Sequence, residues 1–142
     1  MAATGLDVFD RTLQITNIWL NDIQESLGPD EQRAWRVLGA VLHGLRDRFP
    51  SDLSAHLGAQ LPLLIRGLYY DQYRPSAPAT RWRSMDEFAA AIDERLSGAR
   101  PTDRADAVRA VFRVLKKHVD RGQIEKLQDA LPGPIRDAWI EA

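Results

Sequence analysis

The segment HLGAQLPLLIR, residues 56–66, has a second version in KLQDALPGPIR, residues 126–136. Both place a leucine, a Leu-Pro pair and an Ile-Arg pair at the same spacing, and the offset between them is 70 residues (126 − 56). Proline suits the first turn of a helix but breaks a helix interior, so each Leu-Pro pair predicts a helix start. We therefore expect the two segments to be equivalent parts of one duplicated unit.

The agreement extends upstream from both segments. The offset stays at 70 in the helix before each segment, where Ala40-Val41 matches Ala110-Val111 and Leu45 matches Leu115. One turn earlier the offset is 69, and the matched pairs are Trp19 with Phe88, Ile23 with Ile92 and Leu27 with Leu96. The predicted organisation is a first helical repeat at residues 1–75, an inter-repeat loop at 76–83 and a second helical repeat at 84–142.

Apolar residues recur every three or four positions, which is typical of helices that bury one face. The first such face is the longest and consists of Leu6, Phe9, Leu13, Thr16, Leu20, Ile23 and Leu27. Gly28, Pro50 and Pro62 then mark helix boundaries. No run alternates apolar and polar residues as a strand does. The sequence predicts an all-α fold, a tandem duplicated unit of about four helices each, packed as one compact bundle because each unit alone has a thin core.

Composition narrows the functional classes. The chain has 142 residues, 44% of them hydrophobic, a formal net charge of -1 and no cysteine. This charge disfavours a dedicated nucleic-acid binder, which usually has a basic excess. Residues 1–10 do not have the pattern of a secretory signal, and no run approaches the roughly 20 apolar residues of a membrane span. We expect a cytoplasmic protein with no membrane partner.

Several runs of residues carry a resemblance that covers almost the whole chain. They are Asn17–Leu20, Arg36–Phe49, His56–Tyr70 and, more weakly, Val111-Phe112, His118-Val119 and Leu131-Pro132. On these residues the chain resembles the bacterial family called domain of unknown function 2267, although Gly39 stands where relatives usually carry arginine. The resemblance implies a bacterial origin and supports the helical fold. It implies no activity or catalytic residues, because the family has none established.

The histidines do not form a recognisable metal motif. Asp52 and His56 lie four residues apart and could face one ion from a helix, but two ligands are too few for a structural site. His118 follows two lysines at a predicted helix end, where positive charge offsets the helix dipole. No phosphate-binding glycine loop, nucleophile elbow or cysteine nucleophile occurs. We predict no metal, no cofactor and no catalytic residue.

Two sets of arginines have alternative interpretations. Arg46 and Arg48 could form a phosphate or nucleic-acid patch with Arg81 and Arg83, but the first two also end a predicted helix, and this reading is favoured. Arg66 and Arg136 occur at the same place in both copies. We interpret Arg66 and Arg136 as structural arginines that tie the fourth helix of each unit to carboxylates or helix-end carbonyls.

The candidate binding surface is the region that occurs once. Residues 67–75, GLYYDQYRP, and the later Arg-Trp-Arg at 81–83 have no counterpart in the second copy. Consecutive helical residues point about 100° apart, so if Tyr69 is inward then Tyr70 or Tyr73 should be partly exposed. Tyrosine, tryptophan and arginine commonly anchor interfaces. The predicted binding residues are Tyr70, Tyr73, Arg74, Arg81, Trp82 and Arg83; the alternative is that this loop only covers the junction between units.

We predict a non-enzymatic binding or interaction module, with an unknown protein partner or self-association. A first alternative is a nucleic-acid binder that uses helix-turn-helix-like units, such as residues 36–48 and 51–60. The second of these helices offers few side chains that read bases, and nucleic acid is therefore an unlikely partner. A second alternative is an enzyme with a site between the repeats, which would require a deep pocket there.

Overall fold

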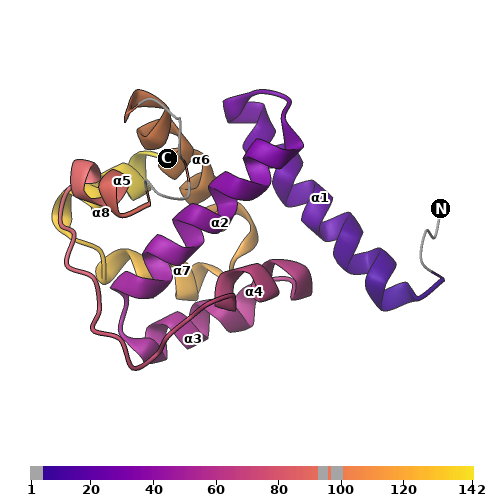
Figure 1. The fold of residues 1–142 in the computed structure, drawn as a ribbon, viewed down its shortest axis with the longest axis horizontal. Coiled ribbons are helices and arrows are strands. Elements are labelled where there is room, and N and C mark those ends of the chain that lie inside the picture. The colour runs from indigo at the N-terminus through magenta and orange to yellow at the C-terminus, as the bar shows by residue number, and fades with distance from the viewer. Residues whose placement is uncertain (1–4, 93–95, 97–100) are drawn as a thin grey trace.

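The computed structural model describes residues 5–92, 96 and 101–142. The described residues form helices and no strand, which confirms the predicted all-α class (Figure 1). The helices are α1 (Asp7–Leu27), α2 (Glu31–Arg48), α3 (Ser51–Gln60), α4 (Leu63–Tyr70), α5 (Met85–Ile92), α6 (Pro101–His118), α7 (Arg121–Asp129) and α8 (Gly133–Glu141). Within these ranges, no helix is both long enough and apolar enough to cross a membrane.

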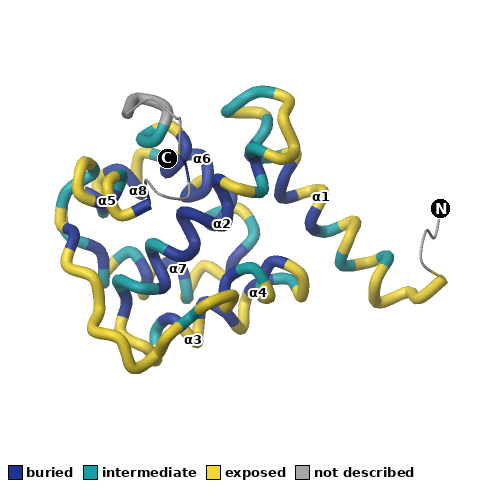
Figure 2. Tube along the Cα trace, in the orientation of Figure 1, coloured by how far each residue is buried: buried dark blue, intermediate teal, exposed yellow. Residues whose placement is uncertain are grey.

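Helix α2 forms the centre of a compact bundle. It contacts α1, α3, α4, α5 and α6, and almost every residue from Ala34 to Arg46 is buried (Figure 2). Such a helix is apolar on most of its circumference because it has neighbours on most sides. The core continues through α6 to Trp139 on α8, whose side chain is fully buried.

Short signals in the sequence set the helix boundaries. Gly28 ends α1 in a left-handed conformation, with a φ of 98° that favours glycine. Asp30 then precedes α2, and its side chain accepts a hydrogen bond from the backbone N–H of Arg33. Pro50 and Pro62 occupy the positions immediately before α3 and α4.

The first half of α1 differs from the prediction. Its apolar face was expected to be buried throughout, but Leu6, Phe9 and Leu13 are exposed and burial begins at Thr16. Figure 1 shows the reason, since this half of the helix projects beyond the other described helices. Periodicity identified the helix and one apolar side, but it does not show where along that side the rest of the fold ends.

Arg66 and Arg136 make the same contacts at an offset of 70 residues. Arg66 Nε donates to Gly58 O at 3.0 Å, and Arg136 Nε donates to Gln128 O at 3.2 Å. Each Nη2 donates to two further carbonyls at the end of the preceding helix, those of Ala59 and Leu61 or of Asp129 and Leu131. The partners are helix-end carbonyls and not carboxylates. This agreement supports a duplicated unit, which stays a prediction together with its division at residues 76–83.

Candidate binding site

The α4–α5 loop, residues 71–84, is fixed across the end of α2. The backbone N–H of Thr80 donates to Asp47 O at 2.9 Å, and Arg48 Nε donates to Trp82 O at 3.1 Å. The end nearer α4 is closed by a bond from Tyr73 N to Tyr70 O at 3.0 Å. The loop therefore has a defined position although most of its side chains are exposed.

Trp82 lies inside the protein and not on the predicted surface. Its side chain is only 4% exposed and stacks on Phe88 of α5, with ring centroids 4.1 Å apart. The Arg48 guanidinium also lies over the Trp82 ring, 5.5 Å from its centroid. Burying a large apolar ring is favourable where the loop meets α5. Trp82 is thus part of the core. Its burial agrees with the alternative interpretation, in which the loop covers the junction between the units.

Tyr70, Tyr73 and Arg74 lie together at the end of α4. The rings of Tyr70 and Tyr73 are 6.0 Å apart, and Tyr70 is partly exposed. The hydroxyl end of Tyr70 rests against Gly58 of α3, where a Cβ atom would displace it. Tyr73 lies under the guanidinium of Arg46, 5.0 Å from the ring centroid. Arg74 is exposed.

Arg46 is buried and holds the end of α4. Its Nη1 donates to Tyr69 O at 2.7 Å and to Asp71 O at 2.9 Å, and its Nε pairs with Asp47 at 2.9 Å. The Tyr69 hydroxyl donates to Ser54 O at 2.7 Å, and Ser54 Oγ donates back to Arg46 O at 2.7 Å. Burial raises the pKa of Tyr69 well above its usual value, so this hydroxyl stays a donor. Arg46 therefore fixes the position at which the loop leaves α4.

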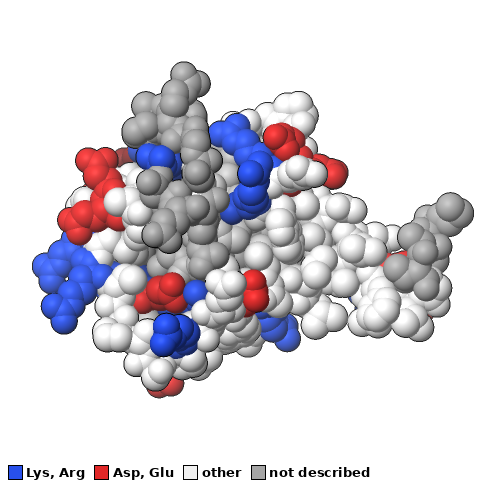
Figure 3. Space-filling model, viewed as in Figure 1, with Lys and Arg blue, Asp and Glu red and all other residues white. Residues whose placement is uncertain are grey.

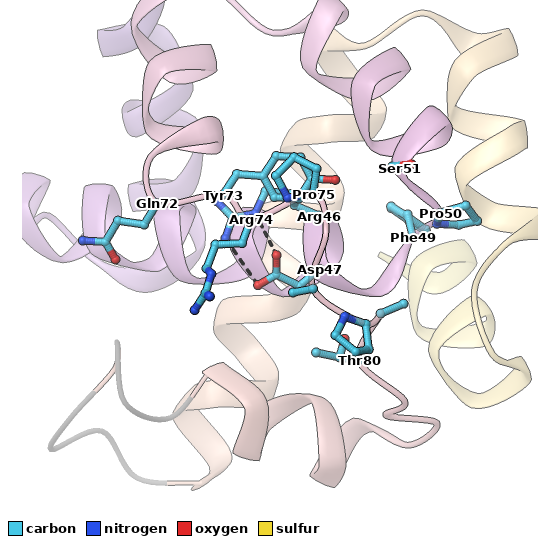
Figure 4. A pocket seen from close by; sticks show the side chains of 13 residues that line it. Arg46, Asp47, Phe49, Pro50, Ser51, Gln72, Tyr73, Arg74, Pro75 and Thr80 are labelled. Atoms are coloured by element: carbon cyan, nitrogen blue, oxygen red, sulfur yellow. Dashed lines mark hydrogen bonds and ion pairs between the residues drawn. The ribbon is translucent and has the colours of Figure 1, made fainter.

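A hollow of about 550 Å³ opens between the loop and the α2–α3 corner (Figure 4). Arg46, Asp47 and Tyr73 form its floor, with Arg74 beside them in the close view. The rest of the lining combines apolar side chains with a few polar ones, namely Phe49, Pro50, Pro75, Ala77, Pro78 and Ala79 with Ser51, Gln72 and Thr80. The mixture of apolar walls and a few charged groups is typical of sites that hold a ligand or a peptide segment.

Two further hollows continue this one toward α8. The second, about 370 Å³, shares Pro78, Ala79 and Thr80 with the first and adds Arg48, Arg81 and Arg83. The third, about 420 Å³, keeps Arg48 and Arg83 and reaches residues 132–134 at the start of α8. We call the three adjoining hollows the loop groove.

The α8 side of the loop groove is positively charged. Arg48, Arg81 and Arg83 line it, and none of them makes an ion pair with a carboxylate of the described residues. Figure 3 shows basic side chains gathered at this edge of the molecule. The start of α8 adds the partial positive charge of a helix N-terminus. The groove therefore favours an anionic partner.

The three histidines have different surroundings. His43 is buried, with Nε2 2.6 Å from Leu68 O, whereas His56 is exposed. His118 Nε2 lies 2.6 Å from Asp22 Oδ2, so it contacts α1 in addition to ending α6. In the ranges that the structure describes, no three His, Asp or Glu side chains are placed to hold a metal ion.

Sequence reasoning missed that Arg46 is buried, although the offset of 70 carried a signal. The equivalent position is Lys116, whose Nζ donates to three carbonyls at the end of α8, those of Trp139, Ile140 and Ala142. Both side chains thus bind the carboxyl end of a fourth helix. A basic residue repeated at one register indicates a structural role, and this separates Arg46 from its exposed neighbour Arg74.

The sequence model of the family described as uncharacterized conserved protein (DUF2267) matches residues 16–138, and the chain belongs to this family. No curated protein matches the chain.

Proposed function

We propose that the chain is a non-enzymatic binding module whose loop groove holds an acidic segment of a partner protein. The observation that carries the proposal is the line of Arg48, Arg81 and Arg83 along two adjoining hollows, without carboxylate partners in the described residues. Arg81 and Arg83 are exposed, so their guanidinium groups can form bidentate hydrogen bonds to carboxylates of another molecule, whereas Arg48 is half-buried and already donates to Trp82 O. The duplicated unit and a cytoplasmic location stay predictions beside this proposal.

The shape of the groove favours a peptide over a nucleic acid. Its first hollow has apolar walls from Phe49 and the loop prolines, which suit side chains of an extended peptide. Its three arginines offer fewer phosphate contacts than the roughly 6–10 that accompany strong DNA binding. The formal net charge of -1 also gives no general attraction to a polyanion.

An enzymatic function has less support. A site between the units would need to collect side chains such as Arg66, Arg136 or two histidines. Both arginines instead bind carbonyls at the end of the helix that precedes them, α3 for Arg66 and α7 for Arg136. Neither arginine lines a hollow of the loop groove. Their hydrogen-bonding capacity is used in holding helices together.

The proposal is tested with fluorescent peptides about ten residues long, either rich in Asp and Glu with one aromatic residue or rich in Lys. Fluorescence anisotropy is measured for both peptides and for a short DNA duplex. We expect the acidic peptide to bind, and Arg81→Ser with Arg83→Ser to weaken its binding by at least about tenfold. Tighter binding of the duplex than of the acidic peptide would favour the nucleic-acid alternative.

A matched control removes the same charge elsewhere. Arg109 and Arg121 are exposed and make only long ion pairs within α6 and α7, at 3.7 Å each. Arg109→Ser with Arg121→Ser should leave peptide binding within about twofold of the original protein, because exposed pairs contribute little. An equal loss in both double variants would show that net charge, and not the groove, governs binding.

A further inference from the structure

The projecting half of α1 carries a row of exposed apolar side chains. Leu6, Phe9 and Leu13 follow one another at spacings of three and four, so they share one side of the helix. All three are exposed, and Figure 2 shows that this end of α1 is the least buried part of the helix. A contiguous exposed apolar row of this kind is typical of a surface that contacts another molecule.

The start of α4 adds two exposed leucines beside the projecting half of α1. The backbone N–H of Leu64 donates to Thr12 Oγ at 3.1 Å, which places α4 beside the projecting half of α1. Leu63 and Leu64 are both exposed there. We call the surface formed by Leu6, Phe9, Leu13, Leu63 and Leu64 the arm surface.

The size of the arm surface matches half of a dimer interface. The exposed fractions of its five side chains, 39–55%, correspond to roughly 500 Å² of apolar area, within the range of the largest patches on monomers, which are often functional. Homodimer interfaces are about 65% apolar, so this area would form the apolar part of roughly 750 Å² per copy. A standard interface buries about 800 Å² on each partner.

We propose that the arm surface binds the arm surface of a second copy of the chain, around a two-fold axis. None of its five side chains is charged or polar, so the matching surface on a partner must be apolar as well. The chain itself supplies one of the same size, and an isologous contact uses the same patch on both copies. The formal net charge of -1 leaves little repulsion between copies.

Helix geometry supplies a matched pair of variants. Phe9 and Ile18 both lie on α1 and are equally exposed, at 49% each. They are nine positions apart, which turns the helix by about 180° and places Ile18 on the opposite side from the arm surface. Phe9→Glu and Ile18→Glu therefore add the same charge to equally exposed sites on opposite sides of one helix.

Analytical ultracentrifugation of the full chain at ~1–100 µM is the test. We expect the unmodified protein to be dimeric at the upper end, and Phe9→Glu to raise the dimer dissociation constant by at least about tenfold. Leu63→Glu, on α4, should do the same, whereas Ile18→Glu should change it by less than about twofold. Far-UV circular dichroism checks that each variant is folded, and Leu63→Glu decides the outcome should Phe9→Glu not fold.

Two results would overturn the proposal. One is an unmodified protein that stays monomeric over the whole concentration range. The other is a dimer that Phe9→Glu and Ile18→Glu weaken equally, which would place the contact elsewhere. The Arg81→Ser and Arg83→Ser variant should keep the dimer intact, so failure of the loop groove and failure of the arm surface are distinguishable.

Discussion

Asp22 is the residue through which α1 and the end of α6 are joined. His118 Nε2 lies 2.6 Å from one carboxylate oxygen, and Lys117 Nζ lies 3.1 Å from the other. The His118 ring also stacks on Trp19, with centroids 5.1 Å apart. Burial acts to raise the pKa of Asp22, but the hydrogen bonds and charges of His118 and Lys117 outweigh it and hold the pKa below its usual value.

The lowered pKa gives a pH-dependent prediction. A carboxyl group whose pKa falls on folding stabilises the fold above its unfolded pKa, and the contribution is lost as pH falls through the folded pKa. We expect Asp22→Asn to lower the free energy of unfolding at neutral pH by about 1–2 kcal/mol. The gap between the two proteins should shrink below about pH 4. Urea unfolding at several pH values measures it, and a gap independent of pH would contradict the assignment.

Single residues also show what the sequence can reveal about the site. The tyrosine spacing predicted that Tyr70 or Tyr73 would be partly exposed if Tyr69 pointed inward; in the structure Tyr69 is buried and Tyr70 is partly exposed. It could not show that Trp82 is buried, since that depends on Phe88 lying beside a loop of irregular backbone. Likewise, the burial of Arg46 depends on carbonyls more than 20 residues away. Residue type identified the candidate binding residues, and tertiary packing decides which of their side chains reach solvent.

At the scale of elements, Gly44 sets how closely α5 approaches α2. A Cβ atom at Gly44 would lie 2.5 Å from Cε1 of Phe88 and 2.9 Å from Cγ2 of Ile92, both buried side chains. Trp82 stacks on Phe88, so that ring has little room to move. The offset of 70 places a valine, Val114, at the corresponding position of α6. The absence of a side chain at Gly44 is therefore a requirement of this one helix contact.

Two glycine variants test the close contact. Gly44→Ala should lower the free energy of unfolding by about 1–3 kcal/mol, because the added methyl group must displace Phe88 or α5. Gly67 is the control, since it lies in α4 and a Cβ atom there would meet nothing within 4 Å. Gly67→Ala should stabilise the fold by up to about 1 kcal/mol through helix propensity. Urea unfolding of both variants measures the difference, and equal effects would mean that α5 tolerates the methyl group.

Element boundaries were more predictable than element packing. Gly28, Pro50 and Pro62 stop or start helices through local backbone restrictions, so they act in the same way in any fold. The extent of the buried face of α1 depends on where α2, α4 and α6 end beside it, which no local pattern encodes. The exposed row from Leu6 to Leu13 is the result.

In the whole molecule, the two predicted halves pack against each other through several pairs of helices. Helix α1 contacts α6, α2 contacts both α5 and α6, and α3 contacts α7. Hydrogen bonds reinforce the α1–α6 contact, including one of 2.5 Å from Arg113 to Ser26 and the Asp22 contacts with Lys117 and His118. Part of the core of each predicted half therefore lies against the other half, and we expect the boundary at residues 76–83 to divide the sequence without dividing the stability.

The contacts between the two predicted halves predict a single cooperative unfolding transition. Far-UV circular dichroism follows all helices, and tryptophan fluorescence follows Trp19 and Trp35 in the first half, Trp139 in the second and Trp82 in the loop between them. Both signals should give the same urea midpoint, as two-state unfolding requires. Ile135→Ala, a fully buried site on α8, should move both midpoints together by an amount equivalent to about 2–5 kcal/mol. Two transitions, with only one displaced by Ile135→Ala, would mean that each half is stable by itself and that the contacts of α1 and α2 with α5 and α6 contribute little.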